Sequence, residues 1–199
     1  LREELDFAAF RGGSLDADLA SRDFTINSLA WSLGGAGGDI VDPGGGMFDL
    51  QQRLVRANSA PVLTEDPLRC LRAYRLAAAL RFSVEQETTH WIAQAAAGLA
   101  EVAGERVGAE LLRLIGEPGL ADWLTQMDRA GVLAVLLPEL LGLKSVEQGG
   151  YHHLDVWWHT LMTVDELERI AAAPEALLST GAPVVREYVG QPHKLVGLK

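Results

Sequence analysis

The chain has 199 residues, of which 48% are hydrophobic, and a formal net charge of −10 at pH 7. This length allows one large or two modest domains, and the apolar content is ample for a core. No run approaches the ~18 apolar residues of a membrane span, and the first residues do not resemble a signal peptide. A single cysteine, Cys70, excludes internal disulfides. We therefore expect a cytoplasmic protein without a membrane partner, with Cys70 as a buried packing residue.

The N-terminal segment predicts a strand, a turn and a helix. Residues 5–10 alternate loosely between apolar and polar side chains, and Arg11-Gly12-Gly13 follows them. This pattern is typical of a strand that ends in a turn, and Asp6 lies in that strand. The next turn, at Arg22-Asp23, leads into a predicted helix over residues 25–33, for which Asp23 is a candidate N-cap.

A second short motif, Glu65-Asp66-Pro67-Leu68-Arg69, predicts a helix with Thr64 as its N-cap, because acidic residues and proline are favoured in a first turn. Asp66 and Arg69 would project from the same helical face. Aspartate only accepts hydrogen bonds and arginine only donates them, so the pair matches the amine and ring acceptor of cytosine or adenine. Guanine and uracil would present a carbonyl oxygen to the carboxylate. The alternative is a solvated ion pair without a function.

Five motifs in order resemble the class II (bacterial-type) tRNA nucleotidyltransferase and poly(A) polymerase family. They are Asp-x-Asp-Leu at 16–19 with RDFTINSLA at 22–30, IVDP at 40–43 with three glycines, FDL at 48–50, RLVR at 53–56, and EDPLR at 65–69 with CLRAYRLAA at 70–78. The resemblance covers roughly residues 4–116. It implies an α+β fold with a polymerase-β-like head, which transfers a nucleotide from CTP or ATP to an RNA 3′ hydroxyl with Mg²⁺.

The resemblance also implies roles for individual residues. Arg22 would meet a phosphate and Asp23 the ribose hydroxyls, with Asn27 in the same nucleotide-binding turn, and these roles suit the chemistry of the two charged groups. Asp6 matches a third catalytic carboxylate on a neighbouring strand. The alternatives are a carboxylate at a strand end that faces water for Asp6 and a helix cap for Asp23.

The catalytic metal pair of the family, an Asp-x-Asp after a glycine-rich turn, has no counterpart in this sequence. Asp16 and Asp18 have the right spacing but lack the glycine turn, and Asp18-Leu19 matches a different family element. Because phosphoryl transfer depends on a positioned metal, we expect the polypeptide as printed to be inactive and its parent protein to be active.

Residues 51–82 are basic within an acidic chain, with six arginines against two acidic residues. Arg69, Arg72 and Arg75 recur every three residues and would form a stripe on one helix. We interpret Arg72 and Arg75 as nucleotide-binding, and Arg53, Arg56 and Arg106 as RNA-binding. The alternative is a solvated helix face. The acidic remainder would suppress indiscriminate nucleic-acid binding.

The rest of the chain is predicted to be helical, over residues 85–99, 105–115, 121–130 and 132–137. The helix at 105–115 resembles the family's neck helix, in which charged residues tie the base-reading helix in place. Boundaries near 58–61 and 145–150 divide the chain into a head (1–57), a helical neck and body (58–147) and a third part (148–199).

The third part carries a different signal. Residues 151–161 resemble the opening helix of an HD metal-dependent phosphohydrolase domain, which some family members carry. His159 matches its first metal ligand, and Asp155, one turn earlier, could orient the imidazole. Such a site would take a transition metal. The alternative is a polar residue at a helix surface.

Together these features favour a template-independent nucleotidyltransferase that adds C or A to an RNA 3′ end, with tRNA as the expected substrate. Only a few residues separate Phe10-Arg11 from Asp18-Leu19, and in the family a short connection here is associated with CC-adding enzymes. The alternatives are a poly(A) polymerase of the same family, an HD-type phosphohydrolase with a degenerate head, and a non-catalytic nucleotide- or RNA-binding module. The oligomeric state stays open.

Overall fold

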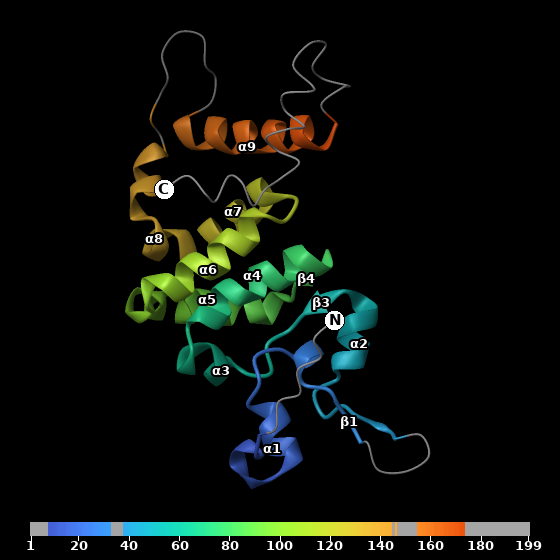
Figure 1. Cartoon of the computed structure of the whole chain (residues 1–199). Coiled ribbons are helices and arrows are strands. Elements are labelled where there is room, and N and C mark those ends of the chain that lie inside the picture. Colours follow the sequence, from blue (N-terminus) through green and yellow to red (C-terminus); the bar gives the residue numbers. More distant parts are fainter. Residues whose placement is uncertain (1–7, 33–37, 145, 147–154, 174–199) are drawn as a thin grey trace.

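The structure, a computed structural model, describes residues 8–32, 38–144, 146 and 155–173. These residues form an α+β fold in which helices dominate (Figure 1). The α-helices are α1 (Leu15–Ala20), α2 (Gly46–Gln52), α3 (Ala60–Glu65), α4 (Leu68–Leu80), α5 (Gln86–Ala95), α6 (Gly104–Ile115), α7 (Leu120–Arg129), α8 (Val132–Leu136) and α9 (Val156–Ala172). Short 3₁₀ turns are η1 (Arg11–Gly13), η2 (Thr25–Asn27), η3 (Ala96–Glu101) and η4 (Pro138–Leu143).

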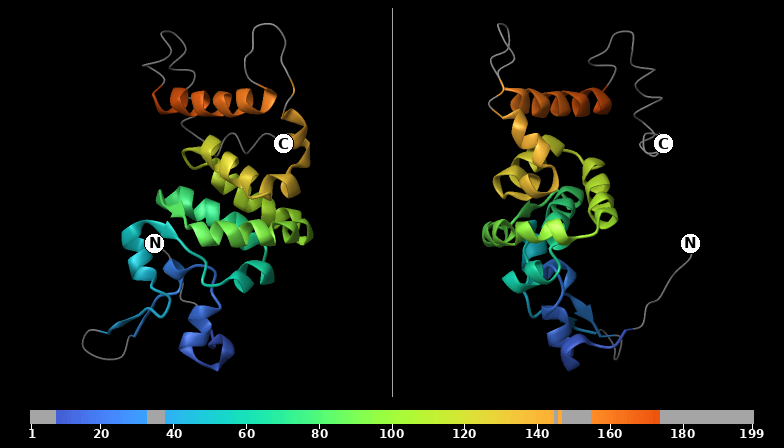
Figure 2. Two further views of the ribbon diagram at one scale, coloured as in Figure 1. Left: turned by 180° about the vertical axis from the view of Figure 1, so that it is seen from behind. Right: turned by 90° about the vertical axis from the view of Figure 1, so that its left-hand side faces the viewer.

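The elements are stacked roughly in chain order, from α1 at one end of the molecule to α9 at the other (Figures 1 and 2). Helix α4 lies in the middle and packs against α6. Its apolar residues recur at helical spacing, so Leu71, Tyr74 and Ala78 are all buried. One continuous core extends from Phe24 to Leu161.

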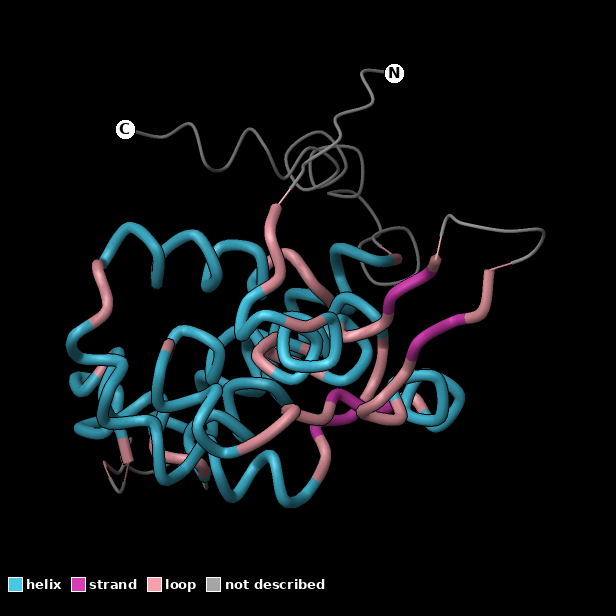
Figure 3. The backbone as a smooth tube through the Cα atoms, turned by 90° about the horizontal axis from the view of Figure 1, so that it is seen from below, coloured by secondary structure: helices cyan, strands magenta, loops and turns pink. Residues whose placement is uncertain are grey.

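The described residues form two small sheets, and the second of them joins segments that are distant in the sequence (Figure 3). Strands β1 (Ala30–Trp31) and β2 (Ile40–Val41) are antiparallel, and Ala30 pairs with Val41. Strands β3 (Leu54–Val55) and β4 (Ser83–Val84) are parallel, and Leu54 pairs with Ser83. The second pair joins the N-terminal part to the helical part through backbone hydrogen bonds.

Most of the predicted helices are present, with shifts at their ends. Helices α6 and α7 agree with the prediction to within one residue at each end, and α5 ends at Ala95, where the chain continues as η3. Cys70 is fully buried as predicted, and burial raises the pKa of its thiol to about 12. None of the helices in the described part of the chain is long and apolar enough to cross a bilayer.

Two predicted helix starts are wrong. The helix over residues 25–33 is only the 3₁₀ turn η2, because the chain then pairs with β2 as strand β1. Thr64 does not cap α4 but lies inside α3, where its hydroxyl donates to the carbonyl of Pro61 at 3.0 Å. Asp66 is extended (φ −136°, ψ 90°), because a residue before proline is disfavoured in the helical region, and α4 begins after Pro67.

Candidate nucleotide-binding site

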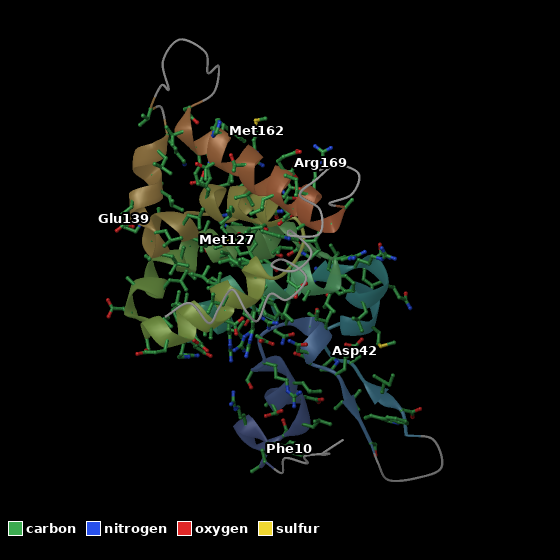
Figure 4. All side chains as sticks on the ribbon, turned by 45° about the horizontal axis from the view of Figure 1, so that its top comes forward. Phe10, Asp42, Met127, Glu139, Met162 and Arg169 are labelled. Carbon is green, nitrogen blue, oxygen red and sulfur yellow. The ribbon has the colours of Figure 1, made fainter. Side chains whose placement is uncertain are left out.

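A cleft of about 580 Å³ brings the two sequence motifs together. It is lined by Ala8, Ala9, Phe10, Arg11, Asp18, Arg22, Asp23, Asn27 and Arg69. Four predicted nucleotide-binding residues therefore face one cavity, three from the turn at 22–27 and Arg69 from the first turn of α4. Phe10 is 59% exposed and lies beside α1, at the end of the molecule away from α9 (Figure 4).

Asp23 is the best-anchored side chain in this cleft. One carboxylate oxygen accepts from the Phe24 backbone amide at 2.9 Å and from Asn27 Nδ2 at 3.1 Å. The other oxygen accepts from Arg72 Nη1 at 3.2 Å. A carboxylate offers about four acceptor positions, so Asp23 retains capacity for a ligand hydroxyl while its orientation is held on both sides.

Arg22 lines the same cleft and carries the opposite charge to Asp23. Its guanidinium donates to Asp18 Oδ2 at 3.1 and 3.3 Å and to the carbonyl of Asn27 at 3.2 Å. Hydrogen bonds from the Arg11 backbone amide and from Arg22 lower the pKa of Asp18. Asp18 therefore serves as an acceptor for Arg22, and 45% of the Arg22 side chain stays exposed to meet an anion.

Asp66 and Arg69 lie close in sequence but bond to different partners. Asp66 accepts from Arg106 Nη2 at 3.0 and 3.2 Å, whereas Arg69 Nη1 donates to the carbonyl of Val62 at 3.1 Å. The expectation that both project from one helical face is wrong in detail, because Asp66 precedes α4. Arg106 holds Asp66 from α6, and its predicted contact with RNA remains a prediction. The base-reading role of the pair remains a prediction.

The stripe of arginines on α4 is largely paired with one buried acid. Glu110 of α6 is 4% exposed and accepts from Arg75 Nε at 2.5 Å. Arg72 Nε lies 3.7 Å from the same carboxylate, and Arg72 also reaches Asp23. The pairing links α6, α4 and the cleft. Arg75 thus supports the helix packing in this structure, and its assignment to nucleotide binding remains a prediction.

A second buried acid, on α2, supports the turn at 22–27. Asp49 of α2 is 1% exposed, accepts from the Thr25 hydroxyl at 2.7 Å and binds Arg56 through both oxygens at 3.0–3.2 Å. Arg56 is therefore tied to the fold, and its predicted RNA-binding role remains a prediction. Arg53 is exposed and forms no ion pair among the described residues. Its RNA-binding role remains a prediction.

Sequence reasoning missed three residues that build this site: Glu110, Asp49 and Asn58. Asn58 Nδ2 donates to the carbonyls of Leu19 and Arg22 at 3.2 and 3.0 Å and to Ser28 Oγ at 2.5 Å, which fixes the turn before Asp23. Asp49 lies inside the recognised motif at 48–50 and Asn58 lies two residues after the motif at 53–56, so their places in the sequence were a usable signal. Glu110 lies within the predicted neck helix, whose charged residues were expected to tie down α4.

The remaining predicted residues lie elsewhere. Asp6 is outside the described residues, so its place beside the cleft stays a prediction. His159 is exposed on α9, and Asp155 is the N-cap of that helix, where its carboxylate accepts from the Trp158 amide at 2.9 Å. Within the described ranges, no three His, Cys, Asp or Glu side chains come together as a metal-binding group. The HD-type metal site stays a prediction.

Two family models match the chain. Residues 2–56 match the poly(A) polymerase head domain, and residues 81–143 match a domain described as the probable RNA and SrmB-binding site of polymerase A. A CC-adding tRNA nucleotidyltransferase of Geobacter sulfurreducens is 47% identical in a region that covers 66% of this chain and 30% of the length of that relative. An A-adding tRNA nucleotidyltransferase of Deinococcus radiodurans is 36% identical over 90% of this chain and 41% of its own.

Solved structures agree with these matches. A tRNA nucleotidyltransferase in complex with a primer tRNA and an incoming ATP analogue aligns with a TM-score of 0.65 and 26% identity, over 85% of this chain and 46% of that one. The chain thus spans less than half the length of these relatives. The predicted α+β fold with a polymerase-like head is confirmed. The chain belongs to the family of class II tRNA nucleotidyltransferases and poly(A) polymerases.

Proposed function

We propose that the protein carrying this chain is a template-independent, cytoplasmic nucleotidyltransferase that adds C or A from CTP or ATP to a tRNA 3′ end. The observation that carries the proposal is the cleft in which Arg22, Asp23 and Asn27 of one motif meet Arg69 of another. A nucleoside triphosphate needs a cation for its phosphates, an acceptor for its ribose hydroxyls and donors and acceptors for its base. The cleft supplies the first two directly.

The chain's own residues bind and orient the nucleotide. Arg22, supported by Asp18, holds the phosphates, and Asp23, held by Arg72 and the Phe24 amide, accepts from the ribose. Arg69 stands at the same cleft as the donor half of the base reader. Asp66, oriented by Arg106, supplies the acceptor half from the residue before Pro67. Fixed side chains of this kind favour one nucleotide pose and so lower the entropic part of the barrier.

Members of this family generally use divalent metal ions, and we assign Mg²⁺ to the parent enzyme. Within the residues that the structure describes, no acidic cluster fits such an ion. The short connection from Phe10-Arg11 to Asp18-Leu19 supports CC addition over complete CCA addition, and the similarity to a CC-adding relative is in line with this assignment.

The experiment that tests the proposal measures nucleotide selection in the full-length protein. Asp66→Ala removes the acceptor that excludes the carbonyl of uracil and guanine, so discrimination against UTP and GTP should relax by roughly 1–3 kcal/mol, the scale of a good bidentate base contact. The readout is kcat/KM for each of the four triphosphates with a tRNA that lacks its 3′ end. Arg69→Ala should lower kcat/KM for all four triphosphates and reduce the differences among these values.

A matched control is Glu65→Ala, which removes the neighbouring exposed carboxylate and should leave selectivity unchanged. Equal selectivity in Asp66→Ala and the wild-type protein would refute the base-reading role. Failure of the wild-type protein to extend RNA with any triphosphate would refute the function itself.

A further inference from the structure

A second cavity, of about 500 Å³, lies at the opposite end of α4 from the nucleotide cleft. It opens between the end of α4 and the start of α7, and the two cavities share no lining residue. Arg69 faces the first cavity and Arg81 the second. Twelve residues separate them, which corresponds to about 18 Å along a helix.

Arg81 has an unusual backbone conformation. It ends α4 with φ +57°, in the left-handed region that usually selects glycine at this position. Its side chain is exposed and forms no ion pair with any described residue. The packing thus gives no reason for an arginine where glycine would be less strained, and such outliers cluster at functional sites.

A second arginine of the same kind lies beside it. Arg53 ends α2 with φ +56° and is also exposed and unpaired among the described residues. Its carbonyl accepts from the Ser83 amide at 2.9 Å, so its backbone adjoins the cavity wall. Two unpaired cations therefore lie at the adjacent starts of β3 and β4.

The rest of the cavity has the groups that bind a nucleotide. Trp123 lines the cavity while it packs partly against the core, and its ring is held by a hydrogen bond from Nε1 to the carbonyl of Pro118 at 3.3 Å. Phe82 adds a second aromatic side chain. Asp122 and Gln126 line the same space, and neither side chain has a hydrogen-bond partner within the described part of the molecule. Stacking surfaces beside a basic group are the usual means of holding single-stranded RNA.

We propose that this cavity binds one nucleotide of the RNA substrate, with its phosphate on Arg81 and its base on Trp123. All but one of the lining residues fall within 81–143, the segment that matches an RNA-binding domain model. The proposal rests on the function proposed above and adds a second contact to it, away from the reacting end. A free nucleotide has the same chemistry, so the test must separate it from RNA.

The main variant is Arg81→Gly, which removes the cation and also relieves the left-handed strain. Thermal stability should stay level or rise, while affinity for a labelled RNA hairpin with a single-stranded 3′ tail should fall about tenfold. The dependence of log affinity on log salt should become shallower by about 0.7, the value for one single-strand phosphate contact. Trp123→Leu in the full-length protein should weaken RNA binding by a similar factor without changing this slope.

Two comparisons make the result decisive. Arg129→Ala removes an exposed arginine of α7 outside the cavity and should leave RNA affinity within twofold. CTP affinity should be the same in Arg81→Gly and the wild-type protein, because CTP binds in the other cleft. Unchanged RNA affinity in Arg81→Gly, with nucleotide addition intact in the wild type, would overturn this proposal alone. A matching loss of CTP affinity would reassign the cavity to a free nucleotide, and an absence of RNA binding in the wild type would remove both proposals.

Discussion

Asp23 combines a structural and a ligand-binding position at the level of a single residue. Its carboxylate joins the Phe24 amide, Asn27 and Arg72, and it also faces the cleft. These contacts correct the prediction that Asp23 caps a helix, because the turn that follows is a short 3₁₀ element without a side-chain cap. The carboxylate is instead fixed across a sequence separation of 49 residues.

Asp23→Ala should therefore have two separable effects in the full-length protein. The free energy of unfolding should fall by about 1–3 kcal/mol, because partly buried donors lose their acceptor. The preference for CTP over dCTP should narrow, because the ribose hydroxyls lose the carboxylate that accepts their hydrogen bonds. Both are measured directly, by chemical denaturation and by the ratio of kcat/KM values.

Arg72→Met separates the two effects, because it breaks the ion pair and keeps Asp23. This variant should lose stability but retain most of the preference for ribose. An unchanged CTP to dCTP ratio in Asp23→Ala would leave Asp23 with a structural role only.

Four of the seven residues that the sequence predicted to bind nucleotide, Arg22, Asp23, Asn27 and Arg69, line one cleft. The other three, Asp66, Arg72 and Arg75, do not line it, and the nucleotide-binding role of all seven stays a prediction. The pairs Arg56–Asp49 and Arg75–Glu110 were not foreseen. Arg75 and Glu110 lie 35 residues apart on different helices. Helical periodicity reports which face of a helix is apolar, but it carries no information on which charge of another helix it meets.

Individual elements show the same division between local and distant causes. Helix α6 could be predicted because its apolar residues and its stop at Gly116 are local signals. The error at residues 25–33 came from a partner outside that segment, since β2 draws residues 30–31 into a strand. The error at Thr64 was avoidable, because Pro67 disfavours a helical conformation at Asp66.

Helix α5 offers a test of local capping. Its N-cap is Glu85, whose carboxylate accepts from the amides of Glu87 and Thr88 at 3.0 and 2.8 Å and from the Thr88 hydroxyl at 3.0 Å. Partial burial raises the pKa of Glu85, but these hydrogen bonds together outweigh it, and the net pKa is lowered. A lowered pKa in the folded state stabilises the protein above the unfolded value of about 4.3, and this contribution is lost as pH falls through the folded value.

Glu85→Gln should accordingly cost about 1 kcal/mol of unfolding free energy at pH 7, the usual scale for a lost N-cap. The difference from the wild-type chain should shrink as the pH falls below the lowered pKa, where Glu85 is protonated. Urea denaturation across a pH series measures both the loss of unfolding free energy at pH 7 and its dependence on pH. Glu87→Gln is the neighbouring control and should show a smaller effect. A difference that is independent of pH would contradict the capping role.

The molecule as a whole has one core that runs through the predicted boundary near residues 58–61. Phe24 and Val55 of the N-terminal part belong to the same buried cluster as Tyr74 and Leu133. Hydrogen bonds cross the same point through the parallel pair β3–β4 and from the Ala57 amide to the Thr88 hydroxyl at 3.0 Å. The division into head, neck and third part stays a prediction, but residues 8–143 are expected to unfold together.

This expectation can be checked on the 199-residue chain. Val55 is fully buried on β3, so Val55→Ala should lower stability by about 1–3 kcal/mol and shift one transition for the whole core. Far-UV circular dichroism reports the helices, and tryptophan fluorescence reports local packing. The two curves should coincide before and after the substitution. Two separate midpoints, only one of which shifts in Val55→Ala, would show two independent units.

The parallel pair β3–β4 also has a consequence for exchanging parts between relatives. Strand β3 of the N-terminal segment forms its hydrogen bonds with residues that lie beyond α4. These residues are Ser83–Val84 of β4 and Glu85, whose amide donates to the carbonyl of Val55. A chimaera that joined the head of a CC-adding enzyme to the body of an A-adding one near residue 58 would bring together two strand edges that had never been selected for each other. A crossover after residue 85 keeps both strands and the whole of α4 from one parent. Recombination between such enzymes should therefore tolerate breakpoints beyond β4 better than breakpoints in the linker before α3.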